Sequence, residues 1–195
     1  DYLSRYESIQ IDTFQPEGLS INEKGVAYRG ISARKIIFCQ GVANSLNPWF
    51  KVVPINLLKG ESVTIQCKWQ NDVILNRGIY MVPGRDSHQW RVGATYNWND
   101  HSPRPTDTAR MELIQKLEGI FRIPYSITDQ QWGLRPTTPD RKPILGAHPD
   151  YPSLIIFNGL GTKGVSLAPY FSEVLFRWME NQGAIRKEAD VSRFY

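Results

Sequence analysis

The sequence predicts an α+β protein with α/β-related parts, because it contains two different kinds of strand together with two helices. Ala33 to Gly41 and Leu154 to Phe157 are continuous apolar runs, which are typical of buried parallel strands. Glu61 to Lys68 instead alternates, with apolar Val63, Ile65 and Cys67 on one face, as in an antiparallel sheet with one solvated side. We therefore expect two layers of different architecture, with the chain passing between them.

Other segments complete this arrangement. Gly78 to Pro83 and Gln89 to Thr95 read as strands joined by a turn rich in Pro, Gly, Asp and Ser, and with Glu61 to Lys68 they predict an antiparallel meander. Further extended segments are predicted at Ser8 to Phe14, Gly25 to Gly30 and Ser126 to Arg135.

Two helices follow from apolar periodicity and from residues that favour helix ends. Thr106 is a good N-cap for a helix to about Glu118, with Met111, Ile114 and Leu117 on its apolar side. A second helix is predicted from Thr162 to about Gln182, before Gly183. Its apolar stripe contains Leu167, Phe171, Val174, Leu175 and Trp178, and the residues after Lys187 are expected to be peripheral.

Composition limits the classes of function. No apolar run reaches the roughly 20 residues of a membrane helix, so we expect no membrane partner. The net charge of +4 is mild and the basic residues are scattered, which argues against a nucleic-acid surface and suits a small anionic ligand or simply a solvated surface. Cys39 and Cys67 lie in apolar runs and predict two buried thiols in a reducing, cytoplasmic compartment. The three histidines are far apart, so no metal site is expected.

A glycine-rich segment follows the predicted strand at Leu154 to Phe157. Gly159, Gly161 and Gly164 separate this strand from the second helix, and Lys163 adds a positive charge there. The first N–H groups of a helix lack internal partners and attract negative charge. Taken alone, the segment is open to two interpretations: an anion-binding turn, or a tight connection in which the glycines serve only packing.

Arg135 lies between Leu134 and Pro136, which biases its backbone towards an extended shape. Its guanidinium could grip a carboxylate through two parallel hydrogen bonds. A surface arginine in a proline-rich loop is the alternative interpretation of the same residues.

Considered together, the two segments resemble the C-terminal portion of the D-amino-acid oxidase and glycine oxidase (DAO) superfamily of FAD-dependent oxidoreductases. Gly133 to Gly146 is similar to the family pattern Gly-Leu-Arg-Pro-x-Thr-x-Asp-x-x-Pro-x-x-Gly, and Gly159 to Pro169 to the glycine-rich turn and helix that follow it. Ile36 to Gly41 resembles the family strand that ends beside FAD, and Tyr80 to Pro83 with Val92 to Thr95 the substrate-domain hairpin.

The resemblance implies roles for particular residues. Arg135 would bind the substrate carboxylate and Tyr80 would line the substrate pocket. Gly41 and the run Gly161, Thr162, Lys163, Gly164 and Val165 would contact a non-covalent FAD, and no side chain is required as a catalytic acid or base. We therefore expect Arg135 and the Thr162 to Gly164 turn to face one shared cavity.

The family's opening dinucleotide-binding glycine loop has no counterpart before Ile36, so we expect a C-terminal fragment that is inactive alone and from which FAD is absent. The resemblance implies a partial FAD-linked reductase fold. Its expected parts are a substrate-domain remnant (1–30), an FAD-domain strand segment (31–48), the substrate domain (49–132), the C-terminal segment of the FAD-binding domain (133–183) and a tail (184–195).

The resemblance implies an oxidoreductase that oxidises the C–N bond of a small anionic amine or amino acid by hydride transfer to flavin. Two alternatives stay open. One is a flavin-dependent enzyme that acts on glycerol phosphate or modifies tRNA. The other is a non-catalytic half that needs a partner chain.

Overall fold

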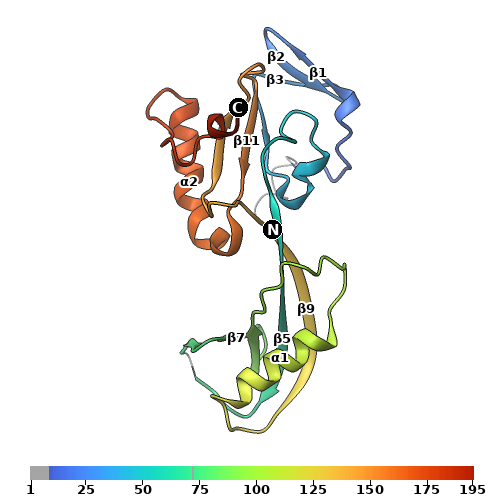
Figure 1. The fold of residues 1–195 in the computed structure, drawn as a ribbon, viewed down its shortest axis with the longest axis vertical. Helices are drawn as coiled ribbons and strands as arrows, with labels where there is room; N and C mark the ends of the chain where they lie inside the picture. Colours follow the sequence, from blue (N-terminus) through green and yellow to red (C-terminus); the bar gives the residue numbers. More distant parts are fainter. Residues whose placement is uncertain (1–8, 72) are drawn as a thin grey trace.

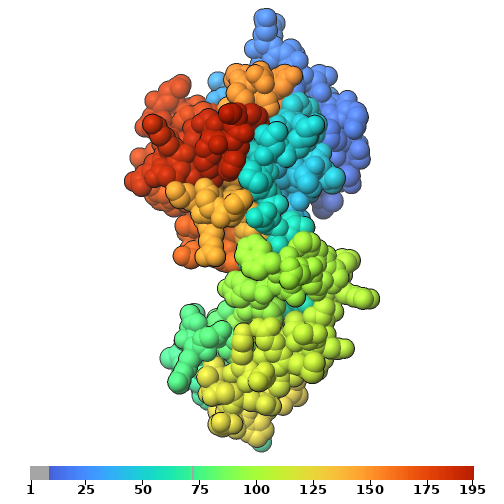
Figure 2. Space-filling model, viewed as in Figure 1, coloured from blue at the N-terminus to red at the C-terminus, as the bar shows by residue number. Residues whose placement is uncertain are grey.

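The computed structural model describes residues 9–71 and 73–195, and shows an elongated molecule of two lobes (Figure 1). The long strands β5 (Asn56–Cys67) and β9 (Tyr125–Thr137) run from one lobe to the other and pair with each other along their whole length. The space-filling view narrows between the lobes (Figure 2). The expected mixture of α and β elements is confirmed.

One lobe is built on a five-stranded antiparallel sheet in the order β6-β7-β8-β5-β9. Its other strands are β6 (Leu75–Asn76), β7 (Tyr80–Pro83) and β8 (Gln89–Gly93). The antiparallel prediction is confirmed, but the predicted meander order is wrong. β8, not β7, pairs with β5. The long connection after β5 lets β7 lie one strand further away, and β8 then fills the place between them.

The alternation in β5 places its apolar side chains against α1 (Asp107–Glu118). Val63, Ile65 and Cys67 are all buried in this core, as predicted. Thr106 caps the helix, accepting a hydrogen bond from Ala109 N at 3.3 Å. The predicted apolar side is wrong at Met111, which is 64% exposed, because the helix is turned so that Ala109, Leu113 and Leu117 are buried.

The second lobe contains a three-stranded sheet in the order β10-β11-β4. The predicted parallel pair is confirmed as β4 (Ile36–Phe38) and β11 (Leu154–Asn158), while β10 (Ile144–Ala147) adds an antiparallel neighbour. Burial of β4 on both faces is wrong, because α2 (Gly164–Met179) covers β10 and β11 but leaves Ile37 41% exposed. Cys39, just after β4, is likewise exposed rather than buried.

The other face of this sheet packs against β1 (Leu19–Asn22) and β2 (Gly25–Tyr28), which with β3 (Ile31–Ala33) form a small antiparallel sheet. Helix α2 ends at Met179, three residues before the predicted end. The residues after Lys187 are not peripheral, since Val191 is fully buried and Leu145 N donates a hydrogen bond to Ala189 O at 2.8 Å.

Residues 9–14 form no strand, so the first predicted strand is wrong there, and Ser8 lies outside the described residues. Within residues 9–71 and 73–195, no helix combines the length and the apolar character that a membrane crossing requires. In the same residues, no three His, Cys, Asp or Glu side chains are placed to share a metal ion.

Candidate functional site

The face of the five-stranded sheet opposite α1 carries three glycines at neighbouring positions, which leave room for long side chains to lie flat. Gly60 on β5 pairs with Gly133 on β9, and Gly93 on β8 pairs with Tyr80 on β7. A methyl group on Gly93 would lie 2.7 Å from the Tyr80 hydroxyl oxygen, so the tyrosine ring reaches across this glycine. The sheet thus provides a glycine floor under its open face.

Arg135 lies on this floor. It sits opposite Leu58 on β5, and its guanidinium folds back over Gly60, where a methyl group would collide with it. Nη1 donates to Thr95 O at 3.3 Å, and the guanidinium carbon lies 5.0 Å from the centre of the Tyr96 ring. Among the described residues, no carboxylate lies within ion-pair distance of Arg135.

Arg135 and Tyr80 line the same cavity, which has a volume of about 230 Å³. Gly60, Gly133, Arg91 and Gln131 also line it. The two residues that the sequence proposes for substrate binding therefore come together, from strands at opposite sides of the sheet.

The residues proposed for cofactor contact lie at one edge of the other lobe. Gly41 follows β4, and the segment from Gly159 follows β11; since the two strands are parallel, their carboxyl ends meet at the same edge. Asn158 joins the two segments: its Nδ2 donates to Gly41 O at 2.9 Å, and its Oδ1 accepts from Gly159 N at 2.8 Å. Asn158 is only 4% exposed, so this link is internal.

The turn before α2 needs its glycines. Gly159 and Gly161 have φ angles of +72° and +58°, in the region that side chains disfavour. A methyl group on Gly159 would also lie 2.7 Å from Thr138 Cγ2. Among the described residues, the N–H groups of Lys163, Gly164 and Val165 donate to no group outside the helix turns, and they point from the positive end of α2.

A second cavity, of about 330 Å³, lies beside this turn. Gly161, Thr162 and Lys163 line it together with Tyr96 and Trp98 from the segment after β8, and Leu58, Thr137, Thr138 and Arg141 complete much of the wall. Gly41, Gly164 and Val165 are not among its lining residues, and the Val165 side chain is 96% exposed.

The expectation that Arg135 and the glycine turn face one shared cavity is wrong. Arg135 and the Gly161 to Lys163 turn line two separate cavities, because the guanidinium folds back over Gly60 instead of extending towards the turn. The cavities are nevertheless adjacent. Tyr96 contacts Arg135 on one side and lines the cavity of the turn, and a methyl group on Gly161 would lie 3.4 Å from Thr137 Cγ2, two residues after Arg135.

Sequence reasoning missed three residues that organise the site: Gly60, Tyr96 and Asn158. Gly60 interrupts an otherwise alternating strand, and an isolated glycine in a strand often marks close approach of another group. Asn158 is a polar residue at the end of an apolar run, directly before a glycine. Tyr96 carries no such signal, because its partner Arg135 is 39 residues away along the chain.

Comparisons with known proteins identify the family and the fold. Residues 10–178 match the family described as DAO, FAD dependent oxidoreductase. The glycine oxidase of Bacillus licheniformis is 32% identical over 149 residues, covering 68% of this chain and 39% of that enzyme. The tRNA 5-methylaminomethyl-2-thiouridine biosynthesis bifunctional protein MnmC of Idiomarina loihiensis is 26% identical, over 74% of this chain and 25% of that protein.

Among solved structures, the iminodiacetate oxidase of Chelativorans sp. BNC1 superposes with a TM-score of 0.73 at 22% identity, over 88% of this chain and 51% of that one. The chain thus spans about half, or less, of the length of the proteins it matches. The fold agrees with that of this oxidase, and the family match covers most of the chain. The chain belongs to the DAO family of FAD-dependent oxidoreductases.

Proposed function

We propose that this chain supplies the substrate site and part of the flavin site of an enzyme that oxidises the C–N bond of a small amino acid or amine. The observation that carries the proposal is Arg135, a half-buried cation with no carboxylate partner among the described residues, in one cavity with Tyr80. A substrate carboxylate would supply the missing negative charge through two charge-assisted hydrogen bonds. We also propose that the chain is divided into the domain segments that the sequence predicts.

The residues near the start of α2 fit an FAD ring system. Gly161 and Gly164 leave the backbone accessible, and the first N–H groups of α2, such as that of Val165, lack an acceptor within the helix and can donate to an electron-rich ring edge. Gly41 lies at the same edge through Asn158. Bound FAD would accept a hydride from the substrate carbon. The protein's task is to hold the substrate carboxylate at Arg135 and to place positive electrostatic potential at the helix start.

The named relatives guide the choice of substrate. Glycine oxidases and an iminodiacetate oxidase are named for small carboxylate amines, so glycine and iminodiacetate are our first candidates. We add sarcosine, the N-methyl derivative of glycine, because it carries the same carboxylate and amine. A role in tRNA modification is the second candidate, because MnmC also matches over most of this chain. We place the enzyme in the cytoplasm, in keeping with two cysteines that form no disulfide.

The test is anaerobic reduction of the flavin by each candidate substrate. The protein would be mixed with FAD, both alone and with the part of the Bacillus licheniformis glycine oxidase that it does not cover. We expect bleaching by carboxylate amines, loss of that bleaching in Arg135→Ala, and retention in Arg177→Ala, an arginine on the exposed side of α2. Bleaching by glycerol 3-phosphate alone, or equal bleaching in Arg135→Ala, would overturn the proposal. Flavin that binds without reduction by any of these compounds would favour a non-catalytic role.

A further inference from the structure

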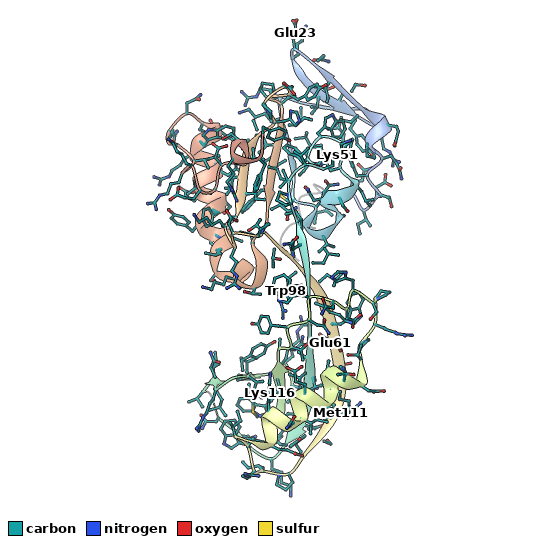
Figure 3. The ribbon with its side chains drawn as sticks, viewed as in Figure 1. Glu23, Lys51, Glu61, Trp98, Met111 and Lys116 are labelled. Carbon is teal, nitrogen blue, oxygen red and sulfur yellow. The ribbon has the colours of Figure 1, made fainter. Side chains whose placement is uncertain are left out.

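Lys59 and Glu61 are buried charged residues on β5 that the proposed chemistry does not use. Lys59 is 1% exposed and Glu61 is 3% exposed, and they lie on the face of the sheet opposite Arg135. Figure 3 shows Glu61 and Trp98 close to the junction of the two lobes. Burying charges is costly unless hydrogen bonds satisfy them, so their partners reveal what these residues stabilise.

All three N–H groups of the Lys59 ammonium go to one segment, residues 94–106, here called the clamp loop. Nζ donates to Asp100 Oδ2 at 2.7 Å, to Ser102 Oγ at 2.9 Å and to Arg104 O at 2.7 Å. An ammonium has three donors, so its hydrogen-bonding capacity is fully used on this loop. These bonds thus hold the middle of the loop against β5.

Glu61 holds both ends of the same loop. Its carboxylate accepts hydrogen bonds from Thr106 N and Thr106 Oγ1, each at 2.8 Å. Its backbone N donates to Thr95 Oγ1 at 2.9 Å, and its carbonyl oxygen accepts from Thr95 N at 3.1 Å. Gln130 Nε2 braces the carboxylate from β9 at 2.8 Å.

This anchoring determines where Tyr96 lies. Lys59 and Asn97 exchange two backbone hydrogen bonds of 2.9 Å, and Thr95 pairs with Glu61, so Tyr96 sits opposite Gly60. Because side chains alternate along paired strands, Tyr96 points to the face that carries Arg135. Its ring then packs beside the guanidinium, while Trp98 lines the cavity of the glycine turn.

We propose that Lys59, Glu61 and Asp100 are positioning residues that fix the clamp loop, and through Tyr96 hold the Arg135 guanidinium in its place over Gly60. The role of Arg135 in binding a substrate carboxylate rests on the proposed function. The position of its guanidinium over Gly60 does not. Asp100 belongs to the group because its carboxylate forms an ion pair with the Lys59 ammonium.

The first test is native-state digestion with chymotrypsin, which cleaves after exposed aromatic residues. Tyr96 and Trp98 are 62% and 49% exposed but held by the loop, whereas Trp90 is buried in the core. Asp100→Asn and Lys59→Met should speed cleavage after Tyr96 and Trp98 about tenfold or more, the effect of losing one charge-assisted hydrogen bond. The matched control is Lys116→Met, which removes a 2.6 Å ion pair with Glu112 on the exposed side of α1.

Cleavage at Tyr96 and Trp98 within twofold of wild type would overturn the proposal, as would a parallel rise after Trp90, which reports global unfolding. Should Lys59→Met fail to fold, Asp100→Asn decides, because the Asp100 side chain is 28% exposed and the buried Lys59 ammonium keeps Glu61 Oε1 as a counter-charge at 3.4 Å.

The second test reads the position of Arg135 without substrate. The Tyr96 ring, whose centre lies 5.0 Å from the guanidinium carbon, should shift the NMR signal of the Arg135 Nε–H group, and Tyr96→Leu gives the reference without the ring. Asp100→Asn should move the signal towards that reference, and an unchanged signal would overturn the proposal. In the FAD-loaded mixture with the complementing part of the glycine oxidase, the same variant should raise the KM for sarcosine more than it lowers kcat. Failure of the proposed function would appear instead as no turnover of sarcosine by the wild type, with both other readouts unaffected.

Discussion

The substitution Gly60→Ala should separate substrate binding from stability. A methyl group at this position would occupy the place of the Arg135 guanidinium, which is the far end of a flexible side chain and can move aside. Gly60 does not have a positive φ angle, so alanine is compatible with its backbone. The change therefore displaces one functional group without distorting the strand.

The contributions to stability partly cancel. Replacing glycine by alanine at a compatible position gains about 0.4–1 kcal/mol through the unfolded state. Moving the guanidinium forfeits a contact with Tyr96 of about 0.5–1 kcal/mol and a hydrogen bond to Thr95 O of about 0.5–1.5 kcal/mol. The losses sum to about 1–2.5 kcal/mol, so we expect the unfolding free energy to fall by about 0–2 kcal/mol, measured by chemical denaturation.

Binding should change far more. Losing a charge-assisted pair with the substrate carboxylate costs about 1.5–3 kcal/mol, or roughly 10- to 150-fold in the KM for a carboxylate amine. The control is Gly183→Ala, outside the cavity, where an added methyl group would make only an ordinary contact of 3.6 Å with Arg177 Cβ. The reasoning is refuted if Gly60→Ala binds glycine or sarcosine as well as wild type, or if Gly183→Ala is equally impaired.

Three further predictions concern other parts of the chain. Asn158→Ala should destabilise the protein by about 1–3 kcal/mol and weaken FAD binding, because the half-buried Gly41 carbonyl and the buried Gly159 N–H both lose their partner; thermal unfolding and flavin titration measure the two effects. Under native conditions, iodoacetamide should label Cys39 and not Cys67, and more slowly than a free thiol at neutral pH because desolvation raises the Cys39 pKa; mass spectrometry reports the site. Hydrogen bonds from Lys59 and Ser102 hold the Asp100 pKa well below its ordinary value of about 3.9, so its ionised form stabilises the fold above that pH and this contribution is lost as pH falls towards the lower folded-state pKa. Denaturation at a series of acidic pH values should therefore show a shallower fall in stability for Asp100→Asn than for wild type.

Local patterns in the sequence predicted those helices and strands that bury only one face. The alternation of Val63, Ile65 and Cys67 identified the core face of β5, and Thr106 identified the start of α1. The order of strands was not predictable in this way, because the place of β8 beside β5 depends on a pairing between distant segments. Burial of Ile37 was wrong for a related reason: an apolar run does not reveal which strands a helix will cover.

The candidate site was predictable as a set of residues but not as a geometry. Pattern and resemblance singled out Arg135 and Tyr80, which the structure brings into one cavity. The direction of the Arg135 guanidinium depends on an empty space above Gly60 and on a tyrosine from another segment, and neither is visible in the sequence around Arg135. The expectation of a shared cavity failed for that reason.

Strand β5 explains how one segment serves both stability and function. Its odd-numbered residues face α1 and the clamp loop, where Val63 and Ile65 build the core and Lys59 and Glu61 fix the loop. Its even-numbered residues face the cavities, and Gly60 leaves space there for Arg135. Because the two sets alternate, a one-residue slip between β5 and β9 would exchange them, losing the core and the site together. The 12-residue register between these strands is therefore under two independent constraints, and it is the feature of the fold on which both lobes depend.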